Sequence, residues 1–332
     1  MTQETSSQTA YVDPHGRRID YVRLSVIDRC DLRCFYCIPK GFKDFEVPDD
    51  WLTFDEIQRL MQAFCELGIS NMRVTGGEPL LRPDLAQLVA NITAKTNIED
   101  ISMSTNAVKL AKYADDLKAA GVERLNISLD TLNPETFKEI SGGKLAKVID
   151  GILAAKDAGF SPIKINMVVM KGINDHQVSE MLDFCSEHGF ILRLIETMPM
   201  GNTGKDATQM YVDLQDIKAE LEKHTPLTPA IARGAGPARY YKTEAGTLIG
   251  FITPISQHFC DTCNRVRIGA DGTLYLCLGQ EHSYPMRPVL RSGASITEIK
   301  EHLIKALALK PKKHEFKEKP DQIIRIMSVT GG

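Results

Sequence analysis

The sequence predicts an α/β fold in which six parallel strands and their helices form a partial (βα)6 TIM-like barrel, and three observations lead to this prediction. Strand-like and helix-like segments alternate between residues 20 and 230, as in parallel sheets whose crossovers are helices. Polar residues recur at every second position of several strands, where a parallel strand buried on both sides would be apolar. Three cysteines follow the first strand, at the end of the barrel where such folds carry their chemistry.

Composition places the chain among ordinary globular proteins. With 332 residues, 43% hydrophobic and 25% charged, it suits either one large domain or a domain plus an appendage. The net charge of −3 gives no general attraction to nucleic acid or to a membrane surface, and no apolar run is long enough to span a bilayer. Residues 1–10 are polar and contain no apolar signal core, so we expect a cytoplasmic protein. Eight cysteines in such a protein favour metal or redox chemistry over disulfides.

The barrel elements follow in a regular order after a loosely ordered lead-in, residues 1–19. Alternating β-formers predict strands at 21–27, 72–75, 101–105, 125–129, 163–169 and 191–195. The intervening patterns predict helices at 83–95, 111–120, 136–140, 146–158, 178–187 and 214–223. A further helix begins after Thr53, where Glu56 completes a capping box, and ends at Gly68. Cys65 and Cys185 lie in helical patterns and are expected to pack in the core.

Polar residues on the predicted strands suggest that one face of the sheet lines a wet or ligand-filled cavity. Leaving such groups buried and unpaired would cost roughly 1–3 kcal/mol each. An alternative is that some of them only cap strand ends and bond to loops. The residues concerned are Ser102, Ser104, Asn106, Asn126, Ser128, Asp130, Lys164 and Asn166.

The first cysteine set, Cys30, Cys34 and Cys37, can direct three thiols at one metal centre from a single loop. Soft thiolates suit iron–sulfur clusters, zinc or Cu(I). A structural zinc site takes four protein ligands, and this loop offers three. Three ligands on a four-iron cluster would leave one iron open to a small molecule. From the spacing alone, zinc and plain packing remain alternatives.

Beyond residue 230 the alternation stops, so we divide the chain into a lead-in at 1–19, a barrel at 20–230 and a C-terminal region at 231–332. Residues 234–237 are typical of a linker, and 240–255 of a hairpin. The second cysteine set, Cys260, Cys263 and Cys277, forms another metal triad, for which a zinc site that borrows His258 or His282 is the alternative. A helix at 296–307 and a basic stretch at 310–319 follow, and the basic stretch is expected to be solvated surface.

The first cysteine set has the spacing Cys-x3-Cys-x2-Cys, with the aromatic Tyr36 just before its last cysteine. In this it resembles the cluster loop of the radical S-adenosylmethionine (SAM) enzymes. The resemblance implies that Cys30, Cys34 and Cys37 bind a [4Fe–4S] cluster whose open iron chelates SAM. It also implies that reductive cleavage of SAM yields a 5′-deoxyadenosyl radical.

Three further features narrow the resemblance: the stretch 75–79 (Thr-Gly-Gly-Glu-Pro), the second cysteine set with the stretch 264–267 (Asn-Arg-Val-Arg), and the terminal pair 331–332 (Gly-Gly). Together they resemble the family of GTP 3′,8-cyclases, over residues 15–332. This implies cyclisation of GTP to (8S)-3′,8-cyclo-7,8-dihydroguanosine 5′-triphosphate, the first step of molybdenum cofactor biosynthesis. Ala107 departs from the family pattern, in which glycine is usual at this position.

The family resemblance also implies roles for particular residues. SAM contacts are expected at Tyr36, Gly77, Ser128 and Met198. GTP contacts are expected at Arg23, Arg73, Ser104, Lys164, Arg265, Val266 and Arg267. Cys260, Cys263 and Cys277 would bind a second [4Fe–4S] cluster, with one iron open to the guanine. Gly331 and Gly332 would reach the active site and assist the chemistry. A triphosphate needs cations and hydrogen-bond donors, which explains the arginines and the lysine.

The implied partners are GTP, an electron donor and the downstream synthase that makes cyclic pyranopterin monophosphate, with a second copy of the chain as a candidate partner. No nucleic acid or membrane partner is expected. A peptide-modifying radical SAM enzyme with auxiliary clusters is one alternative. A second alternative is a protein without enzymatic activity, either an iron–sulfur electron carrier or a zinc-stabilised binding module. Such a protein would not require a six-unit barrel with a polar cavity.

Overall fold

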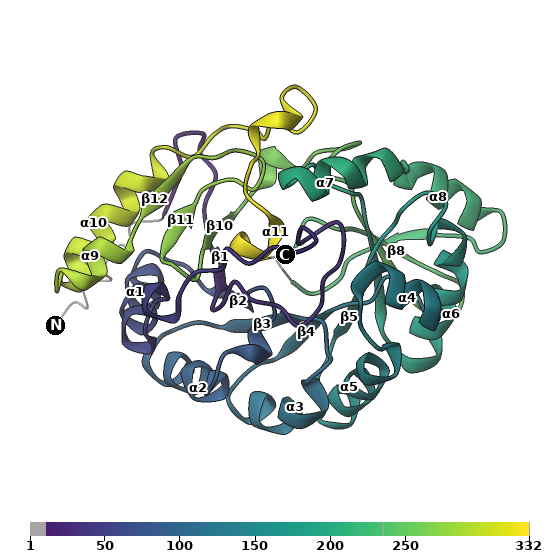
Figure 1. The fold of residues 1–332 in the computed structure, drawn as a ribbon, viewed down its shortest axis with the longest axis horizontal. Coiled ribbons are helices and arrows are strands. Elements are labelled where there is room, and N and C mark those ends of the chain that lie inside the picture. Colours follow the sequence, from purple (N-terminus) through teal and green to yellow (C-terminus); the bar gives the residue numbers. More distant parts are fainter. Residues whose placement is uncertain (1–10, 235, 332) are drawn as a thin grey trace, which may run out of the picture.

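The computed structural model describes residues 11–234 and 236–331, so Gly332 and the first ten residues lie outside the described part of the chain. One curved sheet of twelve strands forms the centre, in the order β12-β11-β10-β1-β2-β3-β4-β5-β6-β9-β8-β7. Figure 1 shows helices along the outer side of this curve and the C-terminal end of the chain inside it. The open, helix-covered sheet is the partial barrel that the alternating pattern predicts.

The barrel strands run parallel and in chain order. They are β1 (Tyr21–Ser25), β2 (Asn71–Thr75), β3 (Asp100–Thr105), β4 (Arg124–Ser128), β5 (Ile163–Val168) and β6 (Ile191–Ile195). The helices that accompany them are α1 (Phe54–Glu66), α2 (Leu85–Lys95), α3 (Leu110–Ala119), α4 (Pro134–Ser141), α5 (Leu145–Asp157), α6 (Val178–His188) and α8 (Leu214–Glu222). The predicted barrel elements are therefore confirmed, with small differences at their ends.

The core lies between the sheet and its outer helices. Val22 and Leu24 of β1 are fully buried, as are Met72 and Val74 of β2, so the apolar residues alternate toward the helices. The capping box at Thr53 and Glu56 is present and begins α1. Cys185 is buried in the core as expected, whereas Cys65 is only partly buried.

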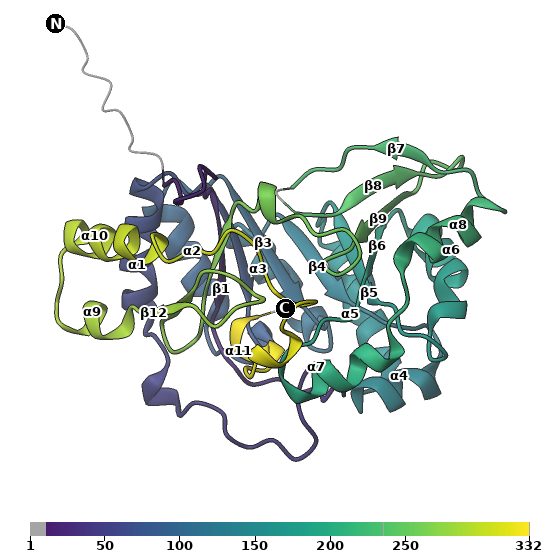
Figure 2. The ribbon, with the colours of Figure 1, turned by 90° about the horizontal axis from the view of Figure 1, so that it is seen from above.

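The C-terminal region adds strands to both ends of the barrel sheet. At one end β9 (Leu248–Ile252) pairs parallel with β6, followed by β8 (Arg239–Lys242) and β7 (Thr228–Ala230). At the other end β10 (Arg265–Ile268) pairs parallel with β1, followed by β11 (Thr273–Tyr275) and β12 (Ser283–Pro285). Figure 2 shows the two ends of the sheet, marked by β12 on one side and β7 on the other. The pairing of β10 with β1 brings the second cysteine set beside the first.

Two expectations about ordered surface segments are wrong. The end of the lead-in, residues 11–19, is packed rather than loose, because Tyr11 and Ile19 are buried and Asp13 pairs with Arg17. The basic stretch is not wholly solvated, because Lys310 is only 3% exposed. Helix α10 (Ile296–Leu307) lies against α1, and its end carries Lys310 into the protein.

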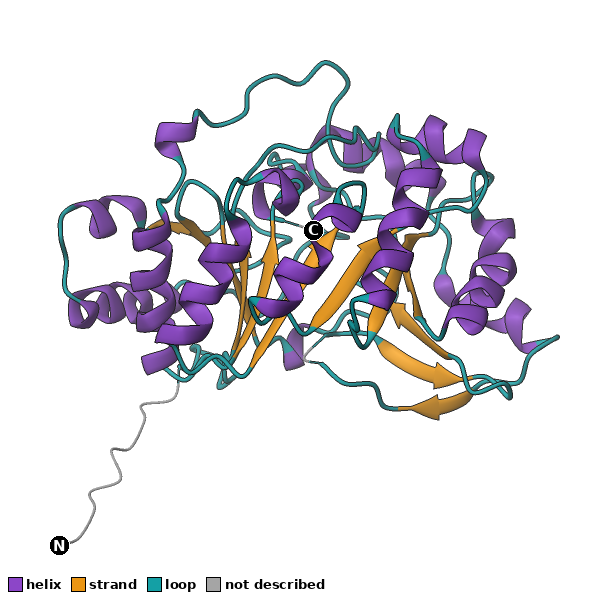
Figure 3. Ribbon diagram, turned by 90° about the horizontal axis from the view of Figure 1, so that it is seen from below, coloured by secondary structure: helices purple, strands orange, loops and turns teal. Residues whose placement is uncertain are grey.

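Some short elements have no counterpart in the sequence prediction. They are α7 (Gly201–Ala207), α9 (Arg287–Arg291) and α11 (Met327–Thr330), together with several 3-10 turns. Figure 3 separates the helices and loops from the strands by colour. In the described part of the chain, no helix has the length and apolarity needed to cross a membrane.

Candidate active site

Both cysteine sets line one cavity of about 280 Å³ inside the curve of the sheet. Polar residues of the barrel strands line the same cavity, among them Ser104, Ser128, Asp130 and Asn166. The prediction that the polar strand face borders a cavity is therefore confirmed. Of the residues expected to contact SAM, Tyr36, Gly77, Ser128 and Met198 all reach this cavity.

The Gly-Gly pair after β2 packs the cysteine loop against the sheet. A Cβ atom on Gly76 would lie 2.5 Å from the Ile27 carbonyl oxygen, and one on Gly77 would lie 2.3 Å from that of Arg29. The Gly77 amide donates to the Ile27 carbonyl at 2.6 Å. Only glycine permits this close approach of two backbones. The stretch therefore fixes the position of the loop that carries Cys30.

Glu78 connects this turn to the end of β3. Its buried carboxylate accepts hydrogen bonds from the Thr105 hydroxyl at 2.7 Å, the Asn106 amide at 2.7 Å and the Leu80 amide at 3.1 Å. Burial raises the pKa of Glu78 to about 7, although these donors oppose the rise. The Asn106 side chain donates in turn to Asp31 at 2.7 Å. The turns after β1, β2 and β3 thus form one hydrogen-bonded unit.

Ala107 occupies the left-handed region, with φ of 62°. Its amide donates to the Thr105 hydroxyl at 3.0 Å, which helps to hold the turn. A non-glycine residue in this region costs roughly 1–2 kcal/mol. Ala107 therefore replaces the usual glycine at the cost of backbone strain in the turn after β3.

Tyr36 is held by a buried carboxyl group at the end of β4. Its hydroxyl donates to Asp130 Oδ2 at 2.7 Å, and the Val168 amide donates to Asp130 Oδ1 at 2.9 Å. Burial raises the pKa of Asp130 to about 6. This contact orients the aromatic side chain between Cys34 and Cys37 toward the cavity.

Burial also governs the first cysteine set. It raises the pKa of Cys30 and of Cys37 to about 12, and the carboxylate of Glu78 adds to the rise at Cys30. Neutral thiols are therefore favoured until a metal centre replaces their protons. Binding of such a centre releases protons as thiolates form.

A group of arginines lies on the inner face of the sheet, where adjacent strands place them side by side; all but the partly buried Arg23 are buried. Arg23 of β1 pairs in register with Arg267 of β10 and with Arg73 of β2. Arg23, Arg73, Arg193, Arg265 and Arg267 all line the cavity. In the part of the chain that the structure describes, none of Arg23, Arg73, Lys164, Arg193 and Arg267 forms an ion pair with a carboxylate.

The charges of these residues shift one another's pKa values. Burial, together with Arg23 and Arg193, lowers the pKa of Arg73 to about 9. Burial raises the pKa of Tyr21, but the neighbouring Arg73 and Arg23 outweigh it and bring the value to about 8. The Nε atoms of Arg23 and Arg267 are buried without a hydrogen-bond partner among the described residues. Such a group is suited to a multiply charged anion.

Lys164 lies next to this group but does not line the cavity. Its ammonium donates to the Arg233 carbonyl at 2.6 Å and to the Tyr240 hydroxyl at 3.3 Å. Burial, together with Arg193 and Arg124, lowers its pKa to about 7. The linker therefore contacts Lys164 through Arg233, and its residues Gly236 and Pro237 line the cavity.

The second cysteine set is held by three cations from distant parts of the chain, and each reaches a different cysteine. Arg17 donates to the Cys260 carbonyl at 2.8 Å, Lys310 donates toward Cys263 Sγ at 3.8 Å, and Arg325 donates to the Cys277 carbonyl at 2.9 Å. Burial raises the pKa of Cys263, but Lys310 and Arg265 outweigh it, so the value lies below the usual one.

Zinc alternatives can be compared with this geometry. Within residues 11–234 and 236–331, no group of three or more histidine, cysteine, aspartate or glutamate side chains could hold a metal ion. A four-iron cluster binds each thiolate through a different iron, so its cysteines stand farther apart than ligands of a single ion. His282 lines a different pocket, and His258 is exposed. The two histidines considered for a zinc site therefore do not join the second cysteine set in such a group among the described residues.

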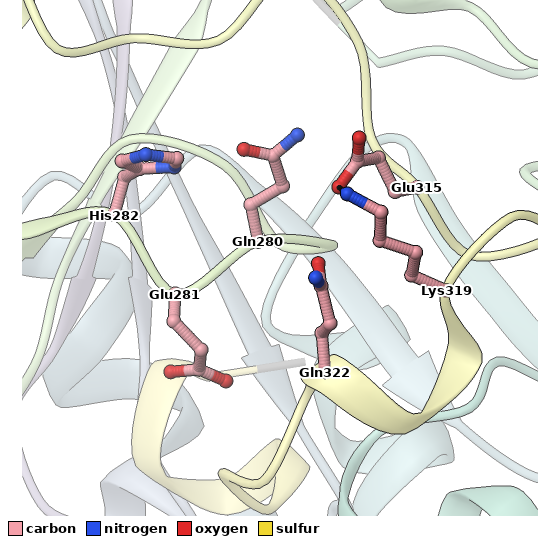
Figure 4. A pocket seen from close by; sticks show the side chains of 6 residues that line it. All are labelled: Gln280, Glu281, His282, Glu315, Lys319 and Gln322. Atoms are coloured by element: carbon pink, nitrogen blue, oxygen red, sulfur yellow. Dashed lines mark ion pairs between the residues drawn. The ribbon is translucent and has the colours of Figure 1, made fainter.

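The pocket that contains His282 is a surface hollow of about 780 Å³. Figure 4 shows its side chains, which come from the loop before β12 and from the segment near residue 319. Glu315 and Lys319 form an ion pair at 3.5 Å across part of it. No cysteine lines this pocket, and its groups are those of a solvated surface. We therefore place the chemistry in the smaller inner cavity.

The C-terminal tail crosses the cavity between the two cysteine sets. Arg325 fixes its start to the Cys277 loop, and the backbone of Ser328 makes a hydrogen bond with Cys37. Met327 and Ser328 line the cavity. Gly331 does not line it but lies against Thr75, which does. The prediction for Gly332 lies outside the described residues.

The structure also reveals residues that the sequence analysis missed. Arg193 of β6 donates to Asn166 Oδ1 at 2.8 Å and to Asn126 Oδ1 at 2.6 Å, and it lines the cavity. Its place on the polar face of the sixth strand could have identified it. Val266, by contrast, is buried and does not line the cavity.

Comparison with known proteins agrees with these observations. Residues 24–185 match the family model described as the radical SAM superfamily, and residues 190–316 match that described as Molybdenum Cofactor Synthesis C. The GTP 3′,8-cyclase of Saccharophagus degradans is 44% identical over 97% of this chain and 98% of its own. The chain belongs to the GTP 3′,8-cyclase family. The relative named GTP 3′,8-cyclase 2 from Pseudomonas aeruginosa is 42% identical over 98% of this chain and 100% of its own.

Solved structures support the fold. The crystal structure of Streptococcus suis SuiB bound to S-adenosylmethionine aligns with a TM-score of 0.59 and 14% identity, over 95% of this chain and 78% of that one. At this identity the match bears on the fold alone. The α/β radical SAM fold with its C-terminal region is confirmed.

Members of the radical SAM superfamily use SAM and a [4Fe–4S] cluster, and the residues of this chain fit both. Three partly buried thiols in one loop line the cavity and provide the donors for a cluster with one open iron. The space beside the loop is the cavity of about 280 Å³, which all three cysteines line. The donor chemistry and the space therefore agree with the family.

Proposed function

We propose that this chain cyclises GTP to (8S)-3′,8-cyclo-7,8-dihydroguanosine 5′-triphosphate, in the first step of molybdenum cofactor biosynthesis. The observation that carries the proposal is the shared cavity, in which two three-cysteine sets face a group of arginines. Of these, the buried Arg73, Arg193 and Arg267 form no ion pair with a carboxylate among the described residues. Neither a peptide nor an electron-transfer partner requires so much uncompensated positive charge. A nucleoside triphosphate does.

The barrel at residues 20–230 binds the first cluster and SAM in this proposal. Cys30, Cys34 and Cys37 hold the cluster. Tyr36, Gly77, Ser128 and Met198 contact SAM and position it against the open iron. Asp130 supports this arrangement by fixing the Tyr36 hydroxyl at 2.7 Å.

In the region at residues 231–332, Cys260, Cys263 and Cys277 would hold a second [4Fe–4S] cluster, which would bind the guanine. Arg23, Arg73, Ser104, Arg265 and Arg267 would form the GTP site, and Arg193 joins them because it lines the same cavity. Lys164 would act from beside the cavity, and Val266 lies between two of these arginines in β10. Arginine pairs bind phosphate oxygens in a bidentate manner, which orients the triphosphate as well as neutralising it.

The chain's own residues orient the ribose and exclude water. When bound, SAM and the first cluster would supply the radical chemistry that removes hydrogen from C3′ of the ribose. The cations hold the triphosphate so that C3′ faces this radical while C8 of guanine lies within reach of C3′. The tail across the cavity, with Gly331 and Gly332 at its end, assists the cyclisation and limits access of solvent.

The proposal includes partners outside the chain. A low-potential donor supplies electrons, and the product passes to the synthase that makes cyclic pyranopterin monophosphate. The reaction takes place in the cytoplasm, and a second copy of the chain is a candidate partner. Neither nucleic acid nor membrane takes part.

The test is anaerobic reconstitution followed by turnover with GTP or ATP. Iron and sulfide analysis should give about eight irons per chain, which corresponds to two four-iron clusters. With SAM and reductant, GTP should yield both 5′-deoxyadenosine and a cyclised nucleotide, and ATP should yield no cyclised product. SAM cleavage without a GTP product would contradict the proposed substrate and direct the search to peptides.

A further inference from the structure

Lys310 is a buried cation beside the second cysteine set. It belongs to a basic stretch, yet it is only 3% exposed, whereas Lys313 of the same stretch is exposed and pairs with Glu318. The Lys310 carbonyl oxygen accepts a hydrogen bond from the His15 ring nitrogen Nε2 at 3.1 Å. The side chain itself points inward, to the loops of Cys263 and Cys277.

The contacts of the Lys310 ammonium account for its three donors. It donates to the Arg265 carbonyl at 2.9 Å and to the Leu276 carbonyl, and it lies 3.8 Å from Cys263 Sγ. In the described part of the chain it forms no ion pair with a carboxylate. A buried ammonium without a counter-charge is costly. The sulfur of Cys263 is the group that can provide one.

The surroundings of the two cysteine sets have opposite charge. Carboxyl groups of Asp31, Glu78 and Asp130 lie around the first set. The guanidinium groups of Arg17, Arg265 and Arg267 and the ammonium of Lys310 lie around the second. Charge near a cluster is one of the properties that set its reduction potential. The two sets therefore differ in the electrostatic stabilisation that they give to an added electron.

We propose that Lys310 is the charge partner of the second cluster and raises its reduction potential by stabilising the reduced state. The inference rests on the proposed function, which places a [4Fe–4S] cluster on Cys260, Cys263 and Cys277. Lys310 is a positioning residue in this proposal, because it acts through the cluster and does not contact GTP.

The redox step involves one electron and no bond change. A [4Fe–4S]2+ core with three thiolates has a net charge of −1, and one electron from an external low-potential donor, dithionite in the test, takes it to −2. A fixed positive charge in contact with Cys263 stabilises the second state more than the first. Removing that charge therefore makes the cluster harder to reduce.

The experiment compares Lys310→Gln, which keeps donors for the two carbonyls but loses the charge, with Lys310→Arg, which keeps the charge. Lys313→Gln is the matched control, because it removes an exposed lysine from the same stretch. Each variant is made in the full chain, both with all cysteines and with Cys30, Cys34 and Cys37 replaced by Ala so that only the second cluster remains. Iron, sulfide and a dithionite titration followed by electron paramagnetic resonance are measured.

The expected result is a lower midpoint potential for Lys310→Gln, by 59 mV for each tenfold loss in relative stability of the reduced cluster. Lys310→Arg and Lys313→Gln should stay close to the parent. If the Lys310→Gln protein loses the second cluster while the Lys310→Arg protein retains it, the positive charge is needed to bind the cluster. That result also supports Lys310 as the charge partner of the cluster. An unchanged potential in Lys310→Gln, or loss of the cluster in both variants, would overturn it. A parent protein with only about four irons would instead refute the second cluster itself.

Discussion

A Cβ atom on Gly331 would lie 2.2 Å from the Cγ2 methyl group of Thr75, the last residue of β2. Gly331 also has φ of 69°, a conformation that side chains rarely adopt. Thr75 lines the inner cavity, and it begins the turn that packs the first cysteine loop. Gly331 in the tail thus contacts the wall of the candidate active site, at a position that only glycine fits.

Gly331→Ala should displace the tail and lower turnover. The left-handed backbone alone costs roughly 1–2 kcal/mol for alanine, and the contact with Thr75 adds to it, so we expect a loss of about tenfold or more. Turnover is measured together with iron content, which should not change. Gly293→Ala is the matched control, since Gly293 has φ of 81° and nothing within 4 Å of its added Cβ. Equal activity in the two variants would contradict a role for the tail.

Arg193→Gln should weaken GTP binding. Arg193 lies in the cavity and is held by Asn126 and Asn166, so its charge is directed at the place proposed for the triphosphate. Hydrogen bonds to charged groups contribute about 1.5–3 kcal/mol, which corresponds to roughly 10- to 150-fold in affinity. Anaerobic calorimetry measures the change. Arg291→Gln, which breaks a distant ion pair with Glu56, should leave GTP affinity unchanged.

GTP affinity should depend on pH through Lys164. Its pKa of about 7 in the free protein means that the ammonium form predominates below pH 7 and is lost above it. An anion binds the charged form, so affinity should be nearly constant below pH 7 and fall by up to about tenfold per pH unit above it. Lys164→Arg stays charged and should remove this fall. The same slope in both proteins would show that Lys164 is not the group responsible.

Arg17→Ala should weaken metal binding by the second cysteine set, although Arg17 lies far from that set in the sequence, in the lead-in. Arg17 pairs with buried Asp13 at 2.6 Å and donates to the carbonyls of Cys260 and Pro311. Breaking a buried pair typically costs about 3–5 kcal/mol, and loss of the contact with Cys260 should reduce iron from about eight toward about four per chain. Thermal unfolding and iron analysis measure both effects.

The adjacent Arg18→Ala is the matched control for this change, because Arg18 is exposed. It should keep both the stability and the iron content of the parent. If Arg17→Ala also keeps its full iron content, the lead-in does not support the second cysteine set.

The barrel could be predicted from sequence because its signals are local. In β6, for example, the apolar run at Ile191, Leu192 and Leu194 marks a buried strand. Arg193 was not recognised as a site residue because it is a single charged residue within this apolar run. Its hydrogen bonds to Asn126 and Asn166 of neighbouring strands become apparent only in the folded sheet. Helix α7, with two glycines in seven residues, has too little helical propensity to be recognised.

The role of Lys310 depends on tertiary structure for another reason. A run of lysines is typical of a solvated surface, and composition alone does not show which lysine turns inward. The inward turn follows from the end of α10 against α1 and from the carbonyls of Arg265 and Leu276, which come from β10 and the end of β11. The packing of Arg17 against Cys260 likewise joins segments 243 residues apart.

The most direct test of the central claim is turnover with GTP that carries deuterium at C3′. Because the cations are proposed to hold C3′ toward the radical, the account predicts that deuterium appears in 5′-deoxyadenosine and is lost from a cyclised nucleotide formed in step with it. Deuterium retained at C3′, with 5′-deoxyadenosine unlabelled, would contradict the proposed position of GTP and the reaction assigned to this cavity.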